Sequence, residues 1–168
     1  MQRTQKASSP PNTWHIVIFP LAAILVVAID QFTKTWIRSS LDIGQSIPET
    51  GFFRLTHIRN SGAAFGLFQG QSELLTIVAL AGIAVLLLYA FLAHRRLPFT
   101  NSVFIKIALG LILGGTVGNL IDRLRFGYIT DFVDVSIWPA FNAADSAIVV
   151  GVILFVYSLL TQPQFWRR

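Results

Sequence analysis

Long apolar runs alternate with short polar segments along this chain of 168 residues. Four of the runs contain about 20 residues or more, the length that an α-helix rising about 1.5 Å per residue needs to cross the ~30 Å hydrocarbon core of a bilayer. The runs cover residues 14–37, 74–93, 102–121 and 142–161. The pattern therefore predicts a mainly α membrane protein with four transmembrane helices.

The segments between the runs predict how the domain is completed. We expect a single domain at 14–162 with outer loops at 38–73 and 122–141, a flexible tail at 1–13 and a second tail at 163–168. The first loop contains FFRLTHI, whose aromatic and β-branched residues are typical of a strand, and turn-forming Gly, Asn and Pro residues surround it. A small extracytoplasmic β-sheet or hairpin beside the membrane is therefore expected.

Composition supports a membrane protein and excludes several kinds of site. The chain is 54% hydrophobic and 12% charged, with a mean hydropathy of +0.63, which is too apolar for a soluble domain of this size. The absence of cysteine excludes disulfides and thiolate chemistry. The three histidines are far apart without metal-ligand spacing, so we expect no metal and no cofactor. The net charge of +5 is scattered among apolar runs, so we expect no nucleic acid partner.

The distribution of charge predicts the orientation in the membrane. Four spans place both termini on one side, which carries seven basic residues and no acid, whereas the other side carries six basic residues and all eight acids, a sum of −8 + 6 = −2. The basic residues alone scarcely choose an orientation under the positive-inside rule, and the acids decide it. We therefore expect both termini in the cytoplasm and a functional site near the outer face.

Carboxylates near lipid usually mark a functional site, because charge there is costly. Asp145 follows Asn142 by three residues, which is typical of a helix N-cap with an acid in the first turn. Only 15 apolar residues, 146–160, follow Asp145, and a helix of that length covers roughly 22 Å, less than the ~30 Å core. A spanning helix must hold Asp145 near the hydrocarbon boundary, a depth that suits a catalytic acid better than a cap alone.

A second acid, Asp131, lies in the apolar sequence YITDFV, where burial is expected to raise the pKa of its carboxyl group. If Asp131 and Asp145 face each other they share a proton, so that one takes a proton from water and the other donates to a scissile carbonyl. Spacing alone shows only that a short segment joins them at one membrane face. The simpler alternative for such residues is a solvated loop acid, which we adopt for Asp134.

Polar residues on the third span suggest a supporting network. Glycines recur every four residues over 110–118 and form a stripe that lets a neighbouring helix approach closely, and Asp122 continues this stripe. Asn119 and Arg123 share an adjacent face. Arg123 snorkelling to headgroups while paired with Asp122 is the simpler alternative. We favour a structural network that holds the site.

Two further residues have a simple interpretation beside a functional one. Asp30 lies near the outer end of the first span with Lys34 one turn later, which predicts an i,i+4 ion pair at a helix end. Asn60 begins a turn rich in small residues at 59–66. Its amide either stabilises that turn or hydrogen-bonds a substrate backbone.

Five ordered motifs resemble one protein family. They are DQFTK at 30–34, RNSGAAFG at 59–66, GGTVGNLIDR at 114–123, ITDF at 129–132 and FNAADSAI at 141–148. Together they resemble lipoprotein signal peptidase, also called signal peptidase II, over residues from about 14 to 161. The family usually has VVDF where this chain has ITDF.

The resemblance implies a bacterial inner-membrane aspartic endopeptidase with four transmembrane helices and a small periplasmic sheet. Such an enzyme cleaves prolipoprotein signal peptides just before the diacylglyceryl-modified cysteine. Its partners would be lipid-modified prolipoproteins and membrane lipids, and we expect a monomer. The implied catalytic pair is Asp131 and Asp145. The implied supporting residues are Asn60, Asn119, Asp122, Arg123, Asn142 and Asp30.

Two other functions remain open from the sequence. An ion- or proton-coupled transporter also uses acids in membranes, but here the acids gather at one face and none lies midway through the second, third or fourth span. A non-catalytic scaffold would use the glycine stripe as its partner surface. It would tolerate Asn at 131 and 145 but not a large residue at Gly114.

Overall fold

The computed structural model describes residues 14–63, 67–96 and 102–161 as four helices and three strands. The elements are α1 (Trp14–Ser40), β1 (Ser46–Ile47), β2 (Arg54–Asn60), α2 (Ser72–Arg96), α3 (Val103–Phe126), β3 (Ile129–Asp134) and α4 (Ala143–Leu160). All four helices are long and apolar enough to span a membrane. The predicted fold class, four transmembrane helices with a small sheet, is confirmed. The predicted tails at 1–13 and 163–168 lie outside the described residues.

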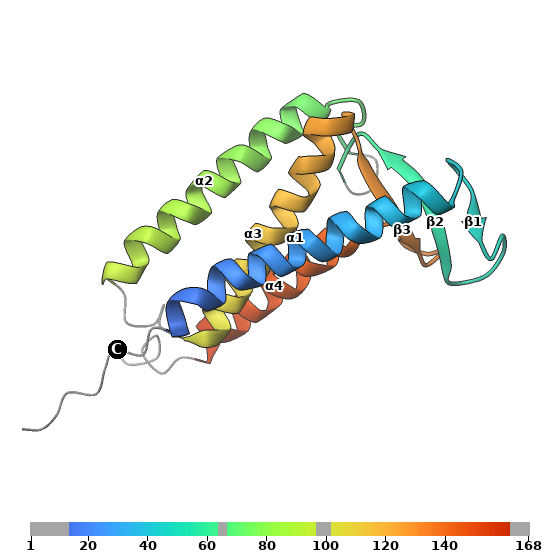
Figure 1. Ribbon diagram of the computed structural model, residues 1–168. Helices are drawn as coiled ribbons and strands as arrows, with labels where there is room; N and C mark the ends of the chain where they lie inside the picture. The colour runs from blue at the N-terminus through green and yellow to red at the C-terminus, as the bar shows by residue number, and fades with distance from the viewer. Residues whose placement is uncertain (1–13, 64–66, 97–101, 162–168) are drawn as a thin grey trace, which may run out of the picture.

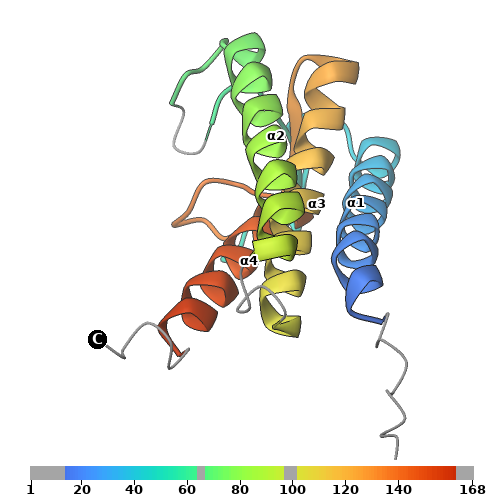
Figure 2. The ribbon, with the colours of Figure 1, turned by 90° about the vertical axis from the view of Figure 1, so that its left-hand side faces the viewer.

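The helices run between two ends of the molecule, and the sheet lies at one of them (Figure 1). Helix α3 is central and packs against α4, α1 and, less extensively, α2. Helix α2 stands apart from α1 in both views (Figures 1 and 2), and none of its residues 72–91 is buried. Its apolar side chains are therefore suited to contact lipid, whereas α3 supplies the interior of the bundle.

The glycine stripe of α3 allows the close approach of a neighbouring helix, as predicted, and that helix is α1. A Cβ atom built on Gly114 would lie 2.6 Å from the carbonyl oxygen of Ala23, and one on Gly110 would lie 2.7 Å from that of Phe19. These separations are too short for any side chain, so glycine is what allows the two helices to approach this closely. Further along the stripe, Gly118 abuts the side chain of Asp30.

Helix α3 continues beyond the predicted span end at residue 121 and stops at Phe126, where Gly127 caps it in the left-handed conformation with φ of 76°. The region 122–141 is therefore not a simple loop, because it contains the last turn of α3 and strand β3. The prediction followed apolar length and ended where charges begin. Two charged residues of this turn have partners outside α3, since Asp122 pairs with α1 and Arg123 donates to Gly62.

The antiparallel sheet has the order β1-β2-β3. Strand β2 is the strand predicted from FFRLTHI, although it starts only at Arg54. Beneath the sheet, Ile37 and Leu41 at the end of α1 form a buried cluster with Phe132 of β3. This cluster fixes β3 against α1, and an isolated bridge between Val133 and Phe141 returns the chain toward the start of α4.

Candidate active site

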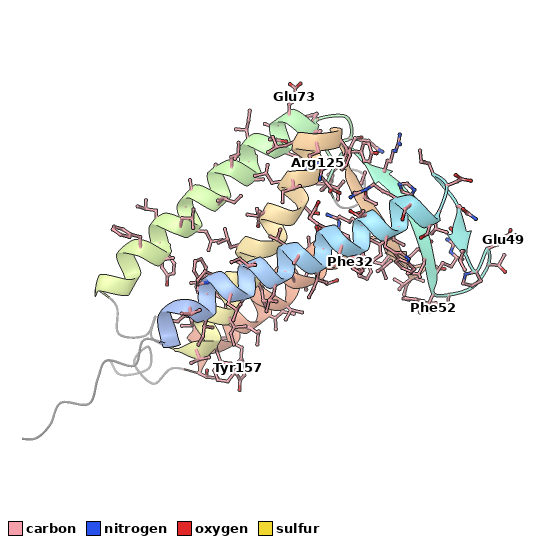
Figure 3. The ribbon with its side chains drawn as sticks, viewed as in Figure 1. Phe32, Glu49, Phe52, Glu73, Arg125 and Tyr157 are labelled. Carbon is pink, nitrogen blue, oxygen red and sulfur yellow. The ribbon has the colours of Figure 1, made fainter. Side chains whose placement is uncertain are left out.

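A cavity of about 320 Å³ lies where α3, α4 and the sheet meet. Its lining includes Asn60, Asn119, Arg123, Asp131, Trp138 and Asp145. Side-chain nitrogen and oxygen atoms gather toward this end of the bundle, whereas the half that bears Tyr157 shows mainly carbon (Figure 3). The structure thus brings five of the predicted supporting and catalytic side chains into one pocket. They come from four separate elements, β2, α3, β3 and α4.

Asp131 lies in β3 with only 2% of its surface exposed. Its Oδ2 accepts a hydrogen bond from Asn60 Nδ2 at 2.9 Å, and its Oδ1 accepts one from Asn142 Nδ2 at 2.8 Å. Burial, reinforced by the nearby charge of Asp145, raises the pKa of Asp131 to about 7, and the two amide donors counteract this only in part. The predicted upward shift of this pKa is confirmed.

Asp145 occupies the third position of α4 and forms a capping box with Asn142. Its Oδ2 accepts from the backbone N–H of Asn142 at 3.2 Å, while the Oδ1 of Asn142 accepts from the N–H of Asp145 at 3.0 Å. The other oxygen, Oδ1, accepts from Asn119 Nδ2 at 2.8 Å. The predicted N-cap is confirmed. The cap occupies Oδ2 of Asp145, and Oδ1 is hydrogen-bonded to Asn119 of α3.

Amide side chains connect the two acids. Asn142 is fully buried, and its Nδ2 donates both to Asp131 and, at 3.1 Å, to Asn119 Oδ1. Asn119 in turn donates to Asp145. Asn60 divides its amide between two tasks, because its Oδ1 accepts from Gly62 N–H at 2.9 Å within its own turn while its Nδ2 reaches Asp131. These amides fix both carboxylates without neutralising either.

Behind the pocket, Asp30 and Asp122 lie fully buried among cations. The predicted ion pair between Asp30 and Lys34 is confirmed at 2.9 Å, but it is buried rather than exposed at a helix end. Asp122 pairs with Lys34 and with Arg38, each at 3.5 Å. The simple alternative, in which Asp122 pairs with Arg123, is wrong in that its ion-pair partners come from α1.

Arg123 lines the pocket and donates to the carbonyl oxygen of Gly62 at 3.3 Å. Its Nε is buried and has no hydrogen-bond partner among the described residues. The guanidinium thus contacts the turn that follows β2 and retains one donor, the buried Nε, without a partner among the described residues. This agrees with the supporting position expected for Arg123 better than with snorkelling toward headgroups.

The interpretation of Asp134 as a solvated loop acid is wrong. It is the last residue of β3, it is 9% exposed, and it forms an ion pair with Arg54 of β2. The backbone N–H of Ser136 and the guanidinium of Arg54 lower the pKa of Asp134. The sequence could not reveal this pairing, because the two residues meet only through the register of β2 and β3.

Other residues near the site were not predicted from the sequence. Trp138 lines the cavity, and its place just before FNAAD was a signal that could have been used. The hydroxyl of Thr130 accepts from Arg38 Nη1 at 3.0 Å, and Gln31 donates to Asp122 at 3.2 Å. No local sequence pattern predicts these contacts. Within residues 14–63, 67–96 and 102–161, no three His, Asp or Glu side chains are grouped so as to hold a metal ion.

Two carboxylates that share one pocket, with one pKa near neutrality, can perform general acid–base chemistry on a bound molecule. The pocket also reaches the lipid-facing side of α4, since Ile148 and Val149 line it and Val149 is 57% exposed. A lipid-linked molecule could therefore approach the acids from the membrane.

Comparisons with known proteins agree with this site. Residues 22–161 match the family described as signal peptidase (SPase) II. The chain is 47% identical to a lipoprotein signal peptidase of Dehalococcoides mccartyi strain BAV1 over 137 residues, which is 82% of this chain and 85% of that protein. It is 46% identical over 143 residues to a lipoprotein signal peptidase of Moorella thermoacetica, which covers 84% of this chain and 92% of that one.

A solved structure shares the fold. It is described as a bacterial membrane enzyme determined by the in meso method at 2.3 Å resolution, and it matches with a TM-score of 0.73 and 32% identity over 93% of each chain. Four membrane-length helices and these relatives fit a multi-pass protein of the bacterial inner membrane. Family match and sequence identity over most of the chain together lead to one conclusion: this protein belongs to the signal peptidase II family of membrane proteases.

Proposed function

We propose that this protein removes the signal peptides of diacylglyceryl-modified prolipoproteins, cutting just before the lipidated cysteine. The observation that carries the proposal is the pairing of Asp131 and Asp145 in one pocket through Asn142 and Asn119. The names of the relatives support the substrate class. The exposed Val149 at the pocket edge supports access for a lipid-anchored substrate.

The proposed mechanism uses the two aspartates as one unit that shares a proton, since two adjacent carboxylates do not comfortably ionise together. The ionised carboxylate takes a proton from water as the water oxygen bonds to the scissile carbonyl carbon, and the protonated one donates to the carbonyl oxygen. The C–N bond then breaks as the leaving nitrogen receives the proton that the first aspartate took from water, while the second aspartate recovers a proton from a hydroxyl group of the tetrahedral intermediate. Apparent pKa values describe the pair rather than either residue alone.

The supporting residues have distinct proposed roles. Asn60, Asn119 and Asn142 orient the carboxylates by donating to them. Asp30 and Asp122 hold the segments that bear the two catalytic acids. Arg123, which lines the cavity, would face the substrate. We propose a monomer in the inner membrane with both termini in the cytoplasm and the site near the outer face, where a membrane-anchored signal peptide ends.

The test is cleavage of a diacylglyceryl-modified prolipoprotein by the purified protein in detergent or lipid. Asp131→Asn and Asp145→Asn should each lower activity by at least about 10³-fold, as loss of one member of a catalytic unit commonly does. Asp134→Asn is the matched control, because Asp134 lies on the same strand but is paired with Arg54. It should retain most of the activity.

Three outcomes would contradict the proposal. Normal cleavage by both dyad variants would exclude a two-aspartate mechanism. No cleavage by the wild type, together with ion flux in proteoliposomes, would favour the transporter. No activity of either kind, with the Asn variants stable and a large residue at Gly114 disruptive to assembly, would favour the scaffold.

A further inference from the structure

Lys34 on α1 is a fully buried cation that contacts three acceptors at once. Its Nζ lies 2.8 Å from Asn119 Oδ1, 2.9 Å from Asp30 Oδ2 and 3.5 Å from Asp122 Oδ2. Lysine has three donors and no acceptor, so these contacts match its capacity. A buried ammonium with this set of partners is held in one place and in turn holds them.

Each of the two acids that Lys34 binds also holds the backbone next to a dyad aspartate. Asp30 Oδ1 accepts from the N–H of Ala144 at 3.0 Å, and Ala144 immediately precedes Asp145. Asp122 Oδ2 accepts from the N–H of Thr130 at 3.0 Å, and Thr130 immediately precedes Asp131. One cation on α1 therefore fixes, through two carboxylates, the segments that carry both aspartates.

The third contact of Lys34 sets the orientation of an amide. Because the ammonium can only donate, the oxygen of Asn119 must face Lys34. The Nδ2 group of Asn119 then points to Asp145 Oδ1 at 2.8 Å, and Asn142 Nδ2 reinforces this orientation by donating to the same amide oxygen. Without Lys34, one of the two donors that select this orientation is lost.

We propose that Lys34 is a positioning residue for the peptidase reaction: it orders both halves of the catalytic pair through Asp30, Asp122 and Asn119, beyond its role as an ion-pair partner. The proposal rests on the proposed function for its activity readout. Lys34 does not line the pocket, so its effect on the reaction is exerted through these three residues.

The charge of Lys34 also acts on the dyad. The charged groups that act on Asp131 are Asp145 on α4, Lys34 on α1 and Arg123 on α3, while β2 presents the neutral amide of Asn60. Lys34 lowers the pKa of Asp131, against burial and the charge of Asp145, which raise it. Removing the ammonium should therefore raise this pKa and move the pH dependence of the reaction in the same direction.

The experiment compares Lys34→Met with Lys106→Met in the full-length protein. Lys106 is a matched control, because it is 8% exposed, lies in the first turn of α3 at the other end of the bundle, and its Nζ has no hydrogen-bond partner among the described residues. Lys34→Met should lower kcat by about 10- to 100-fold, the range seen when a partner that orients an active group is lost, with KM little changed. Lys106→Met should leave both constants near wild type.

A second readout does not depend on activity. Titration of the Asp131 carboxyl, followed by ¹³C NMR and assigned with Asp131→Asn, should move to higher pH in Lys34→Met and stay unchanged in Lys106→Met. If the wild type fails to cleave prolipoprotein, the proposed function fails, but this titration still tests whether Lys34 acts on the dyad. Loss of a lysine that serves only the stability of the fold would leave the titration of Asp131 unchanged.

If Lys34→Met does not fold, a variant that also removes one negative charge keeps the proposal testable. Lys34→Met combined with Asp30→Asn removes one charge of each sign and keeps an amide oxygen that can accept from Ala144 N–H. If this variant folds and shows the same loss of kcat and the same shifted titration, the proposal stands. If either folded Lys34 variant keeps wild-type kcat and an unshifted Asp131 titration, the proposal is overturned.

Discussion

Two pairs of carboxylates lie side by side at the sheet end of this bundle, and their partners differ in kind. Asp30 and Asp122 are fully enclosed and are bound by the cations Lys34 and Arg38. Asp131 and Asp145 border a cavity and are bound by neutral amides. The amides come from Asn60, Asn119 and Asn142.

The difference in partners suits one pair to a structural role and the other to proton transfer. A cation favours the ionised form of a buried carboxylate and makes the pair a fixed structural unit. An amide donates a hydrogen bond but adds no charge, so two carboxylates held by amides still repel each other and retain a proton near neutral pH. A proton that is held near pH 7 and faces a cavity can be transferred during a reaction, whereas a closed ion cluster has no such freedom.

The largest expected contrast is between the stabilities of Asp122→Asn and Asp131→Asn. Asp122→Asn breaks a buried charged cluster and weakens the hold on Thr130 N–H, and should lower the free energy of unfolding by about 3 kcal/mol or more. Asp131→Asn loses one accepted hydrogen bond, worth about 1 kcal/mol, but also removes a buried charge that Asp145 repels. Thermal unfolding in detergent at pH 8 measures both.

Activity should show the reverse order for the same two variants. Asp131→Asn should be inactive, and folded Asp122→Asn should retain some cleavage, because Asp122 does not line the cavity. Equal losses of stability would show that the nature of the partners does not distinguish the pairs. If Asp122→Asn is stable but inactive while Asp131→Asn is active, the catalytic partner of Asp145 is Asp122 and not Asp131.

Stability should also depend on pH with opposite signs for two acids of the same strand. The pKa of Asp131 is raised to about 7 in the folded protein, so the folded state holds a proton that the unfolded chain releases. Its contribution to stability is fully present below about pH 4 and is lost as the pH rises through about 7. The free energy of unfolding of the wild type should therefore fall as the pH rises from 4 to 7. In Asp131→Asn, unfolding followed from pH 4 to 8 should no longer show this slope.

Asp134 is the control for that pH series, because its pKa is lowered. Its contribution is present above the pKa of an unfolded aspartate, near 4, and is lost as the pH falls through the lower folded value. Asp134→Asn should thus lower stability by a constant amount above about pH 4, remove the pH dependence that Asp134 causes at the acid end, and leave the slope from pH 4 to 7 unchanged. A slope that survives Asp131→Asn would show that another group holds the proton.

Much of the fold followed from local patterns. Apolar length predicted four helices, glycine spacing predicted the close approach of a neighbouring helix to the third span, and the spacing of Asn142 and Asp145 predicted the cap. Apolar neighbours of Asp131 predicted its burial. These features succeed because each depends on residues within a few turns of the chain.

The partners of the acids could not be predicted in the same way. Arg54 and Asp134 are 80 residues apart, and Arg38 and Thr130 are 92 apart. Their contacts depend on strand register and helix rotation, which no local pattern fixes. The end of α3 was misplaced for a related reason, since Asp122 and Arg123 continue the helix with partners on α1 and in the turn after β2, which no local pattern shows. The sequence indicated that acids gather and predicted two local partners, Lys34 for Asp30 and Asn142 for Asp145, but not the partners that come from distant segments.

The smallest expected effect tests how tightly the cation-bound pair is enclosed. A Cβ atom at Gly118 would lie 2.6 Å from Asp30 Oδ2, so Gly118→Ala must displace the carboxylate that holds Ala144 N–H. This should cost about 1–3 kcal/mol of stability and lower cleavage. Gly82→Ala on α2 is the same substitution where nothing lies within 4 Å, and it should leave stability unchanged or slightly higher.

Thermal unfolding and cleavage assays on Gly118→Ala and Gly82→Ala separate two explanations of the glycine stripe. If only Gly118→Ala loses stability and activity, the close approach of α3 to α1 keeps Asp30 in position, and the amide-bound pair depends on the cation-bound pair. If Gly118→Ala cleaves normally, Asp30 can shift without moving Asp145. The two pairs would then be neighbours in space that work independently.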